Sequence, residues 1–166
     1  MPGKVIKLDA LKKLRKRWRA QKKKMVFTNG CFDLIHPGHI RYLQEARAAG
    51  DLLVVGLNSD GSVRKIKGKK RPVIPGKDRA EILCALRFVD YVVFFGEDTP
   101  GKLIAALAPD VLIKGADWEL DKIVGADLVL KKGGAVKQIK FAKGYSTSGI
   151  IDEVLKKYCP GRSKKS

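Results

Sequence analysis

The chain has 166 residues, of which 45% are hydrophobic, and its formal net charge at pH 7 is +18. This composition suits one globular domain and excludes a disordered or fibrous chain. No apolar run reaches the roughly 20 residues of a membrane-spanning helix, and the basic N-terminus lacks the apolar stretch of a secretory signal. Cys31, Cys84 and Cys159 are odd in number and widely spaced, which excludes a disulfide framework and indicates a reducing cytoplasm.

The positive charge is concentrated at the two ends of the chain. Residues 1–24 contain eleven Lys and Arg against one acid, and residues 156–166 contain five basic residues and no acid. Basic ends can bind nucleic acid or an anionic membrane, although a solvated helix face is the commoner cause. Because the chain has no recognised nucleic-acid motif and no aromatic residues interleaved with the basic ones, we do not favour either partner.

The apolar pattern alternates between helices and strands. Leu8, Leu11, Leu14 and Trp18 form one stripe, which predicts a basic amphipathic helix within residues 1–24. Strands are predicted at residues 25–28, 52–57, 91–95 and 111–113, with an edge strand at 136–141. Further helices are predicted at residues 39–49, 78–87, 99–108 and 146–158.

This alternation predicts an α/β fold, with a single domain at residues 25–158 built on a doubly wound, mainly parallel, five-stranded sheet. Residues 61–76 are predicted to be one long irregular loop, and Asp78 is predicted to cap the helix that follows. The basic tail at residues 159–166 is predicted to be disordered. In such sheets ligands bind at the carboxyl ends of the strands.

A histidine pair follows the first strand of this domain. His36 and His39 lie three residues apart at a predicted helix start, where free N–H groups and the helix dipole favour an anion. Gly30 allows the backbone to approach a ligand, and Gly38 leaves room between the histidines. Zinc binding would need further ligands that the neighbouring sequence lacks. The pair therefore predicts a phosphate site at which imidazoles stabilise developing charge.

The chain resembles the nucleotidylyltransferase superfamily with the HxGH signature, in the segment Gly30-x-Phe32-Asp33-x-x-His36-x-Gly38-His39. Glycerol-3-phosphate cytidylyltransferase and pantetheine-phosphate adenylyltransferase belong to it. Later segments resemble the ADP-heptose synthase branch, which forms ADP-heptose from ATP and D-glycero-β-D-manno-heptose 1-phosphate. These segments begin at Asn58, Glu97, Pro109 and Gly144.

The resemblance implies a Rossmann-like adenylyltransferase that serves lipopolysaccharide or surface-polysaccharide synthesis. It implies that His36 and His39 stabilise the transition state at the α-phosphate, and that Lys67, with Arg64 nearby, closes over the phosphates. For Lys69 and Lys70 a solvated charge run is the better interpretation. The resemblance also places a series of residues against the nucleotide: Thr28, Asn29, Gly30, Cys31, Phe32, Asp33, Gly38, Gly115, Asp117, Trp118, Tyr145, Ser146, Thr147 and Ser148.

Several of these residues have alternative interpretations. Asp33 orients the loop or a histidine, because a phosphate oxygen needs no general base. Trp118 either flanks the base or packs in the core, and Ser146 or Thr147 caps a helix as well as facing phosphate. Arg79 contacts phosphate or pairs with a neighbouring acid. Cys31 packs, because the transfer needs no thiolate.

The chemistry implies Mg²⁺, held mainly by ATP and water. The apolar stripe of the first helix and the habits of relatives favour a homodimer. A related cytidylyl- or adenylyltransferase acting on glycerol 3-phosphate or a flavin phosphate is the alternative function. A nucleic-acid-binding module is the alternative of a different class, and its affinity would fall steeply with salt.

Overall fold

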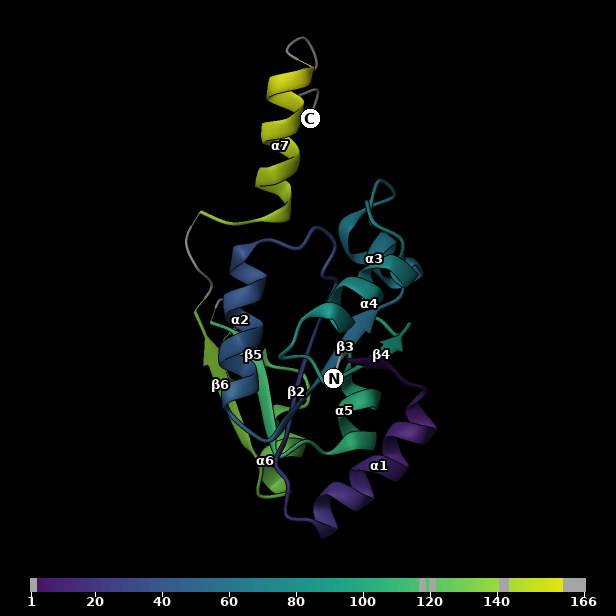
Figure 1. Ribbon diagram of the computed structural model, residues 1–166, viewed down its shortest axis with the longest axis vertical. Helices are drawn as coiled ribbons and strands as arrows, with labels where there is room; N and C mark the ends of the chain where they lie inside the picture. The colour runs from purple at the N-terminus through teal and green to yellow at the C-terminus, as the bar shows by residue number, and fades with distance from the viewer. Residues whose placement is uncertain (1–2, 117–118, 120–121, 141–143, 160–166) are drawn as a thin grey trace.

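The computed structural model describes residues 3–116, 119, 122–140 and 144–159. Its centre is a parallel sheet with strand order β1-β4-β3-β2-β5-β6 (Figure 1). The strands are β1 (Lys4–Val5), β2 (Met25–Gly30), β3 (Leu52–Asn58), β4 (Tyr91–Phe95), β5 (Val111–Gly115) and β6 (Ala135–Ile139). The described helices are α1 (Leu8–Ala20), α2 (Pro37–Ala48), α3 (Asp60–Lys67), α4 (Gly76–Ala85), α5 (Gly101–Leu107), α6 (Ala126–Lys131) and α7 (Thr147–Tyr158).

The predicted α/β class and parallel sheet are confirmed, and the strand count is corrected from five to six. The added strand, β1, has two residues and pairs with the edge of β4. A strand this short has no periodic pattern to reveal it. β6 is the edge strand that the alternation predicted, and it pairs with β5.

The two faces of the sheet are covered by different helices. All seven residues of β3 are buried, and its side chains alternate between the faces. One face packs against α1, α5 and α6, and the other packs against α2 and α4. Such double cover explains why these strands are continuous apolar runs in the sequence.

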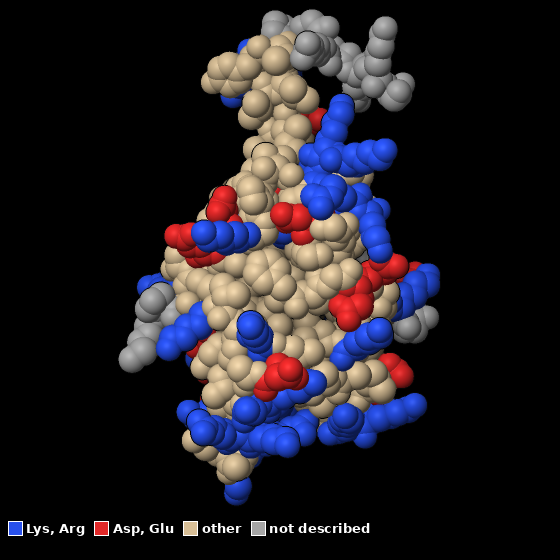
Figure 2. All heavy atoms as spheres, turned by 90° about the vertical axis from the view of Figure 1, so that its right-hand side faces the viewer, with Lys and Arg blue, Asp and Glu red and all other residues tan. Residues whose placement is uncertain are grey.

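Helix α1 is part of this core. Leu11 and Trp18 are buried against the sheet, and the Arg15 side chain, 4% exposed, reaches the carboxylate of Asp110 at 2.8 Å and the carbonyl of Ala108 at 2.8 Å. The apolar stripe that favoured a dimer interface is therefore covered within the chain, which corrects that argument. The remaining faces of α1 gather Lys and Arg at the end of the molecule opposite α7 (Figure 2).

Two local predictions are wrong. The stretch at residues 61–76 is not one irregular loop, because α3 extends to Lys67 and the Ser59 hydroxyl caps it by accepting the N–H of Ser62. The next helix begins at Gly76 with Pro75 at its N-cap, so Asp78 lies inside the first turn and does not cap. No helix among the described residues is long and apolar enough to cross a membrane.

The order of the strands locates the site. The chain builds β2, β3 and β4 outward on one side and then returns to place β5 against the other side of β2, where Val26 pairs with Val111. The carboxyl ends of β2 and β5 therefore border the point at which strand order reverses. Ligands of doubly wound sheets bind in the crevice at this point.

Candidate active site

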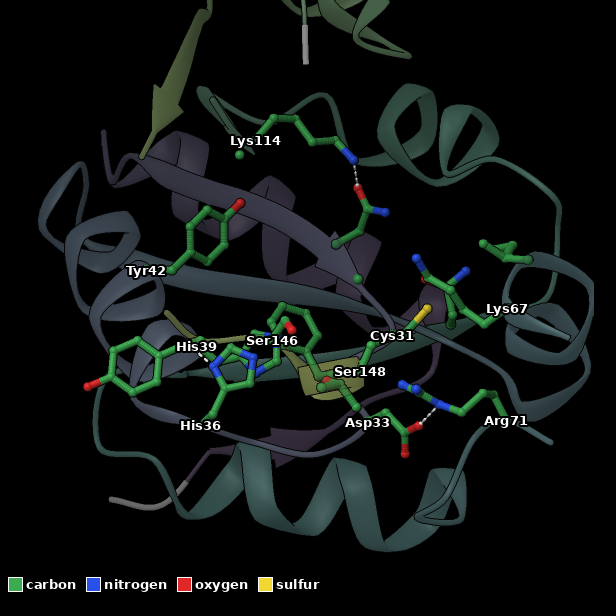
Figure 3. A pocket seen from close by; sticks show the side chains of 18 residues that line it. Cys31, Asp33, His36, His39, Tyr42, Lys67, Arg71, Lys114, Ser146 and Ser148 are labelled. Atoms are coloured by element: carbon green, nitrogen blue, oxygen red, sulfur yellow. Dashed lines mark hydrogen bonds and ion pairs between the residues drawn. The ribbon is translucent and has the colours of Figure 1, made fainter. Parts of the chain in front are cut away.

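A cavity of about 460 Å³ lies at the carboxyl ends of β2 and β5 (Figure 3). The end of β2 and the loop after it form its floor, and the start of α2 brings the two histidines. Lys67 reaches it from the end of α3, and Lys114 reaches it from β5. The turn at residues 145–148, where α7 begins, forms the opposite wall.

The histidines are held by the start of α2. His36 is the N-cap residue, and its Nδ1 accepts the backbone N–H of His39 at 3.3 Å. A neutral His36 that accepts at Nδ1 carries its proton on Nε2. The two rings stack with centroids 3.8 Å apart and an interplanar angle of 18°. Capping and stacking together fix one donor, His36 Nε2–H, on a ring that lines the cavity.

Both imidazoles are neutral at pH 7. Burial lowers the pKa of His36, and burial together with the neighbouring His36 lowers the pKa of His39 to about 4. His39 also packs against the Phe32 ring, at a centroid distance of 5.3 Å. Stacked rings this close resist a second positive charge, so the pair presents N–H groups to the cavity and not two cations.

Position 38 requires a glycine because two neighbouring side chains leave little space for a Cβ. A Cβ at this position would lie 3.0 Å from His36 Nδ1 and 3.2 Å from the Cβ of Tyr145. Gly38 is therefore next to the cavity without lining it. Its predicted role, to leave room beside the histidines, agrees with this geometry.

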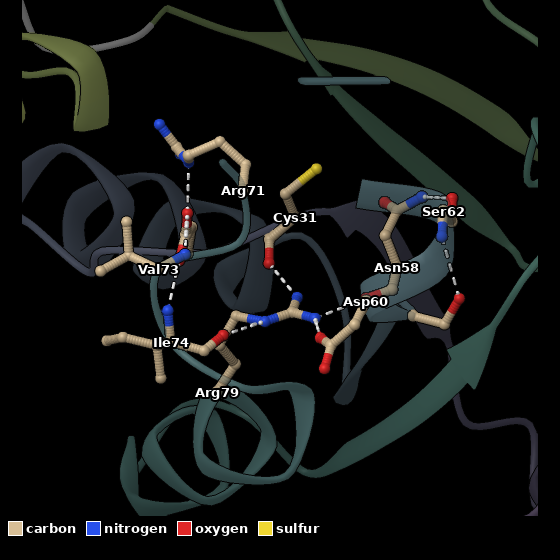
Figure 4. A network of polar contacts seen from close by, with 10 residues as sticks. Cys31, Asn58, Asp60, Ser62, Arg71, Val73, Ile74 and Arg79 are labelled. Atoms are coloured by element: carbon tan, nitrogen blue, oxygen red, sulfur yellow. Dashed lines mark hydrogen bonds and ion pairs between the residues drawn. The ribbon is translucent and has the colours of Figure 1, made fainter. Parts of the chain in front are cut away.

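Asp33 organises the loop after α3. Its carboxylate accepts the Arg71 Nε–H at 2.5 Å and the backbone N–H groups of Val73 and Ile74 at 2.9 Å (Figure 4). Burial alone would raise the pKa of Asp33, but these donors outweigh it and hold the pKa below its usual value. This geometry agrees with the loop-orienting interpretation, and it leaves Asp33 unsuited to act as a base.

Arg79 joins three segments beneath the cavity. Its side chain is fully buried, and it donates to the carbonyls of Cys31, Asn58 and Ile74 and to the carboxylate of Asp60 (Figure 4). Neither predicted role is correct, because Arg79 does not line the cavity and pairs with neither adjacent acid. It ties the ends of β2 and β3 to the start of α3, which brings Lys67 to the cavity at its other end.

Among the described residues, three cations line the cavity. Lys67 and Arg71 lie on one side, and Lys114 reaches Asn29 Oδ1 from β5 (Figure 3). Burial raises the pKa of the Cys31 thiol despite Lys67, Arg79 and Arg71 nearby, so it is protonated at pH 7 and is a poor nucleophile. The described part of the site therefore offers positive charge and N–H donors suited to a polyanion, and its thiol is not activated for attack.

The start of α7 supplies hydroxyls to the cavity. The Ser146 hydroxyl caps α7 by accepting the Gly149 N–H at 2.9 Å, as predicted. Thr147 Oγ1 donates to the Leu34 carbonyl at 3.5 Å, and the Tyr145 ring faces His36 at 6.2 Å and Arg41 at 5.6 Å. The hydroxyls and the free N–H groups of this turn face the same space as the histidines.

Most of the predicted site residues meet in this cavity. Those that line it are Asn29, Gly30, Cys31, Phe32, Asp33, His36, His39, Lys67, Gly115, Tyr145, Ser146, Thr147 and Ser148. Thr28 lies beneath it, with Oγ1 2.7 Å from the Tyr42 hydroxyl, and Arg64 is exposed on α3. Asp117 and Trp118 lie outside the described residues.

The cavity is also lined by Tyr42, Asn58, Ile66, Arg71 and Lys114, to which the sequence analysis assigned no individual role. Lys114 had a usable signal, because it stands at the carboxyl end of a buried parallel strand, where ligands of such sheets bind. Tyr42 had none, since it fits the ordinary pattern of its helix.

A doubly wound parallel α/β fold with a cavity at its switch point and paired histidines at the start of a helix is typical of a nucleotide-binding class of protein. The chain belongs to the cytidylyltransferase-like family, whose model matches residues 27–153.

Bifunctional protein HldE of Citrifermentans bemidjiense is 53% identical over 94% of this chain, and HldE of Helicobacter pylori is 52% identical over 89%. The chain spans about a third of the length of these relatives, at 32% and 31% respectively.

Solved structures agree with this placement. A lipopolysaccharide core biosynthesis protein from Thermoplasma volcanium matches with a TM-score of 0.60 and 31% identity, over 75% of this chain and 99% of that one. Pantoate-beta-alanine ligase from Francisella tularensis, at 12% identity and a TM-score of 0.62, covers 86% of this chain and 68% of that one. The second match supports the fold alone.

Proposed function

We propose that this domain transfers the adenylyl group of ATP to D-glycero-β-D-manno-heptose 1-phosphate, giving ADP-heptose and pyrophosphate. The observation that carries the proposal is the stacked His36–His39 pair at the start of α2, facing a cavity bordered by cations. The HldE relatives and the lipopolysaccharide core biosynthesis protein support the sugar-phosphate acceptor. We place the reaction in the cytoplasm and in surface-polysaccharide synthesis.

In the proposed reaction an oxygen of the sugar phosphate attacks the α-phosphorus of ATP. The bond from this phosphorus to the bridging oxygen breaks, and pyrophosphate leaves with the bonding electrons. The attacking oxygen is already deprotonated, so no general base is needed. The His36 Nε2–H and the N–H groups at the start of α2 stabilise charge on the α-phosphate oxygens.

The cations of the cavity hold the flanking phosphates. Lys67, placed through α3 and Arg79, and Arg71, placed by Asp33, are suited to the triphosphate. Catalysis then consists of positioning and charge compensation, as is usual for phosphoryl transfer. The residues at the start of α7 complete the phosphate site with hydroxyls and N–H groups.

Mg²⁺ is proposed to enter bound to the triphosphate, where it offsets charge on the leaving pyrophosphate. The oxygens of Asp33 are taken by Arg71 and by two backbone N–H groups, and no cluster of three metal-ligating side chains occurs in the described part of the chain. We therefore assign the metal no protein ligand. We also propose a homodimer.

The test is pyrophosphate release with Mg²⁺, crossing ATP and CTP against heptose 1-phosphate (both anomers), glycerol 3-phosphate and a flavin phosphate. We expect turnover with ATP and β-heptose 1-phosphate, and its loss in His36→Ala/His39→Ala. Lys69→Ala, in the exposed charge run, is the matched control. Turnover with another pair would retain the chemistry and replace the substrate. Folded protein that binds ATP but releases no pyrophosphate with any acceptor would refute the proposal.

A further inference from the structure

Helix α1 presents a basic face to solvent. Its buried residues Leu11, Arg15 and Trp18 lie on one side of the helix, since successive side chains are about 100° apart. The exposed residues of the opposite side include four cations: Lys12, Lys13, Lys16 and Arg17. Arg15 binds Asp110 and the carbonyls of Leu107 and Ala108, so the direction of the basic face is set by the fold.

The positive charge continues beyond the end of α1. The chain turns at Lys22, where φ is 56°, and the Lys23 N–H donates to the Trp18 carbonyl at 2.9 Å before β2 begins. Together with the next two lysines and the helix cations, Lys22 forms what we call the α1 basic surface: Lys12, Lys13, Lys16, Arg17, Lys22, Lys23 and Lys24, all exposed. Asp51 borders this surface by accepting the backbone N–H of Lys24. Within the described part of the chain, Lys12 alone of the seven cations forms an ion pair, with Asp9 at 3.3 Å, so the surface is strongly positive (Figure 2).

The α1 basic surface and the cavity lie at opposite ends of the sheet. Lys24 directly precedes β2, whereas the loop after β2 carries Asp33 and His36 to the cavity. In a parallel sheet the amino ends of the strands share one edge and the carboxyl ends share the other (Figure 1). A partner bound to the α1 basic surface therefore leaves the cavity open.

The side chains of the surface indicate the kind of partner that fits. Single-stranded nucleic acid stacks its bases on aromatic side chains, but Trp18, the aromatic residue of α1, is buried. Six of the seven cations are lysines, which act as point charges and lack the bidentate geometry with which arginine recognises individual phosphates. Clusters of about four to eight Lys and Arg on an amphipathic helix are typical of binding to anionic lipid headgroups. A plane of anionic charge therefore suits this surface better than a polynucleotide does.

We propose that the α1 basic surface binds the face of a lipid bilayer that contains anionic lipids. The sequence alone favoured neither a membrane nor nucleic acid, and the structure adds that the cations are held on one outward surface. Because Leu11 and Trp18 are buried in the core, α1 does not insert into the bilayer, and the attachment is electrostatic and reversible by salt. This proposal does not depend on the proposed function.

The first test is co-sedimentation of the full chain with vesicles of phosphatidylcholine that contain about 30% phosphatidylglycerol, in about 0.1 M NaCl. We expect binding to these vesicles and none to vesicles of phosphatidylcholine alone. We also expect release in about 0.5 M NaCl, which screens charges within about 4 Å. Failure to bind the anionic vesicles, equal binding to both kinds, or binding that salt does not weaken would overturn the proposal.

The second test locates the binding surface. Lys13→Gln/Lys16→Gln should raise the dissociation constant for the anionic vesicles about 25-fold, because each cation near an anionic surface contributes about fivefold. Lys13→Arg/Lys16→Arg keeps the charge and should bind as the wild type does. Lys69→Gln/Lys70→Gln is the matched control, since it removes the same charge from exposed positions after α3, at the cavity end, and should change the constant less than about twofold.

Circular dichroism of these variants verifies that α1 and the rest of the chain are folded. Equal losses in Lys13→Gln/Lys16→Gln and Lys69→Gln/Lys70→Gln would overturn the proposal, because binding would then follow net charge and not the α1 basic surface.

The third test compares the bilayer with nucleic acid. Fluorescence anisotropy of a duplex DNA and of a single-stranded RNA, each about 20 nucleotides long, measures binding at the salt concentration of the vesicle test. We expect both to bind more weakly than the anionic vesicles do. Nucleic acid that binds more tightly than the vesicles, and that Lys13→Gln/Lys16→Gln releases, would overturn the proposal and assign the surface to a polynucleotide.

Discussion

The two walls of the cavity are built in different ways. On the side of β2, β3 and α3, the buried groups of Asp33 and Arg79 make a continuous set of hydrogen bonds, mostly of 2.5 to 3.0 Å, that joins segments far apart in the chain. On the side of α7, the wall reaches the body through Thr147 at 3.5 Å and the Tyr145 ring. The first wall is fixed before ligand arrives, and the second has little burial to hold it.

The difference separates two tasks. The fixed wall holds Lys67 and Arg71, which the proposed function assigns to the phosphates, and a small displacement of such groups would slow the reaction. The α7 wall presents hydroxyls and N–H groups, which the proposed function also assigns to the phosphates. Variants on the first wall should therefore change stability and chemistry together, and those on the second should act locally.

The largest effect is expected from Arg79→Met. It removes a fully buried guanidinium and leaves three carbonyls and Asp60 without their donor, so the free energy of unfolding should fall by about 3–5 kcal/mol. Urea denaturation measures the loss. Arg64→Met, at an exposed position of α3, is the control and should change stability by less than about 0.5 kcal/mol. Equal effects of the two changes would contradict the fixed-wall interpretation.

The pH dependence of stability should report the histidine pair. A histidine whose pKa is lowered in the fold binds protons more strongly when unfolded, so stability rises with pH between about 4 and the unfolded value of 6.5. The loss on acidification should be on the order of 2 kcal/mol, and His39→Gln should flatten it. The pKa values of Asp33 and Asp60 are lowered in the fold, so these carboxylates stabilise the protein above their unfolded pKa of 3.8, and this stability is lost as the pH falls below it. The pH range in which the carboxylates act therefore lies below the range in which His39 acts. A wild-type profile flat from pH 6.5 to 4 would refute the pKa assignment.

Lys67→Ala should raise the KM for ATP by about tenfold with a smaller change in kcat, because it removes one charged contact to the triphosphate. Initial-rate kinetics measure the split. Lys69→Ala, two residues further along the same basic run, should leave both constants unchanged. If Lys69→Ala raises the KM for ATP as much as Lys67→Ala does, the basic residues act together as a general positive field. In that case α3 does not position Lys67 for a specific contact with the triphosphate.

The smallest global effect is expected from Ser146→Ala, which removes the cap of α7. Hydrogen exchange in α7 should speed up as expected for a local loss of about 1 kcal/mol. The urea midpoint of the whole chain should not move, because α7 has no buried residue. A shift of that midpoint would show that α7 is part of the cooperative core and would erase the distinction between the walls.

The fold was largely predictable because buried parallel strands leave unmistakable apolar runs, as in β3 and β4. The errors fall where that signal is weak. Helix α3 was missed because it is short, charged and begins with Asp60-Gly61, and its stability comes from the Ser59 cap and from Arg79. The lack of packing around α7 is invisible in the sequence, where Ile150 and Val154 resemble core positions.

The candidate site was predicted to the extent that its residues lie in one segment. Asp33, His36 and His39 lie within one stretch of seven residues, so the sequence alone displays their pattern. Arg79 and Lys114 contact residues that are distant in the chain, such as Asp60 and Asn29. From the sequence neighbours of Arg79 alone, the predicted partner was an adjacent acid, which is wrong. The partners in a long-range polar network can be identified only when the fold is known.

The strand order also determines when the cavity can form as the chain is synthesised. β2, β3 and β4 follow one another, so the sheet segment that holds the histidines and Arg79 can assemble from consecutive pieces. β5 must then return across the chain to pair with β2, and such distant pairings are slow to form. Lys114 and the α7 turn are thus the last parts of the site to arrive. An order of assembly in which β5 pairs last would leave the half of the site on β2 open along the unpaired edge of that strand.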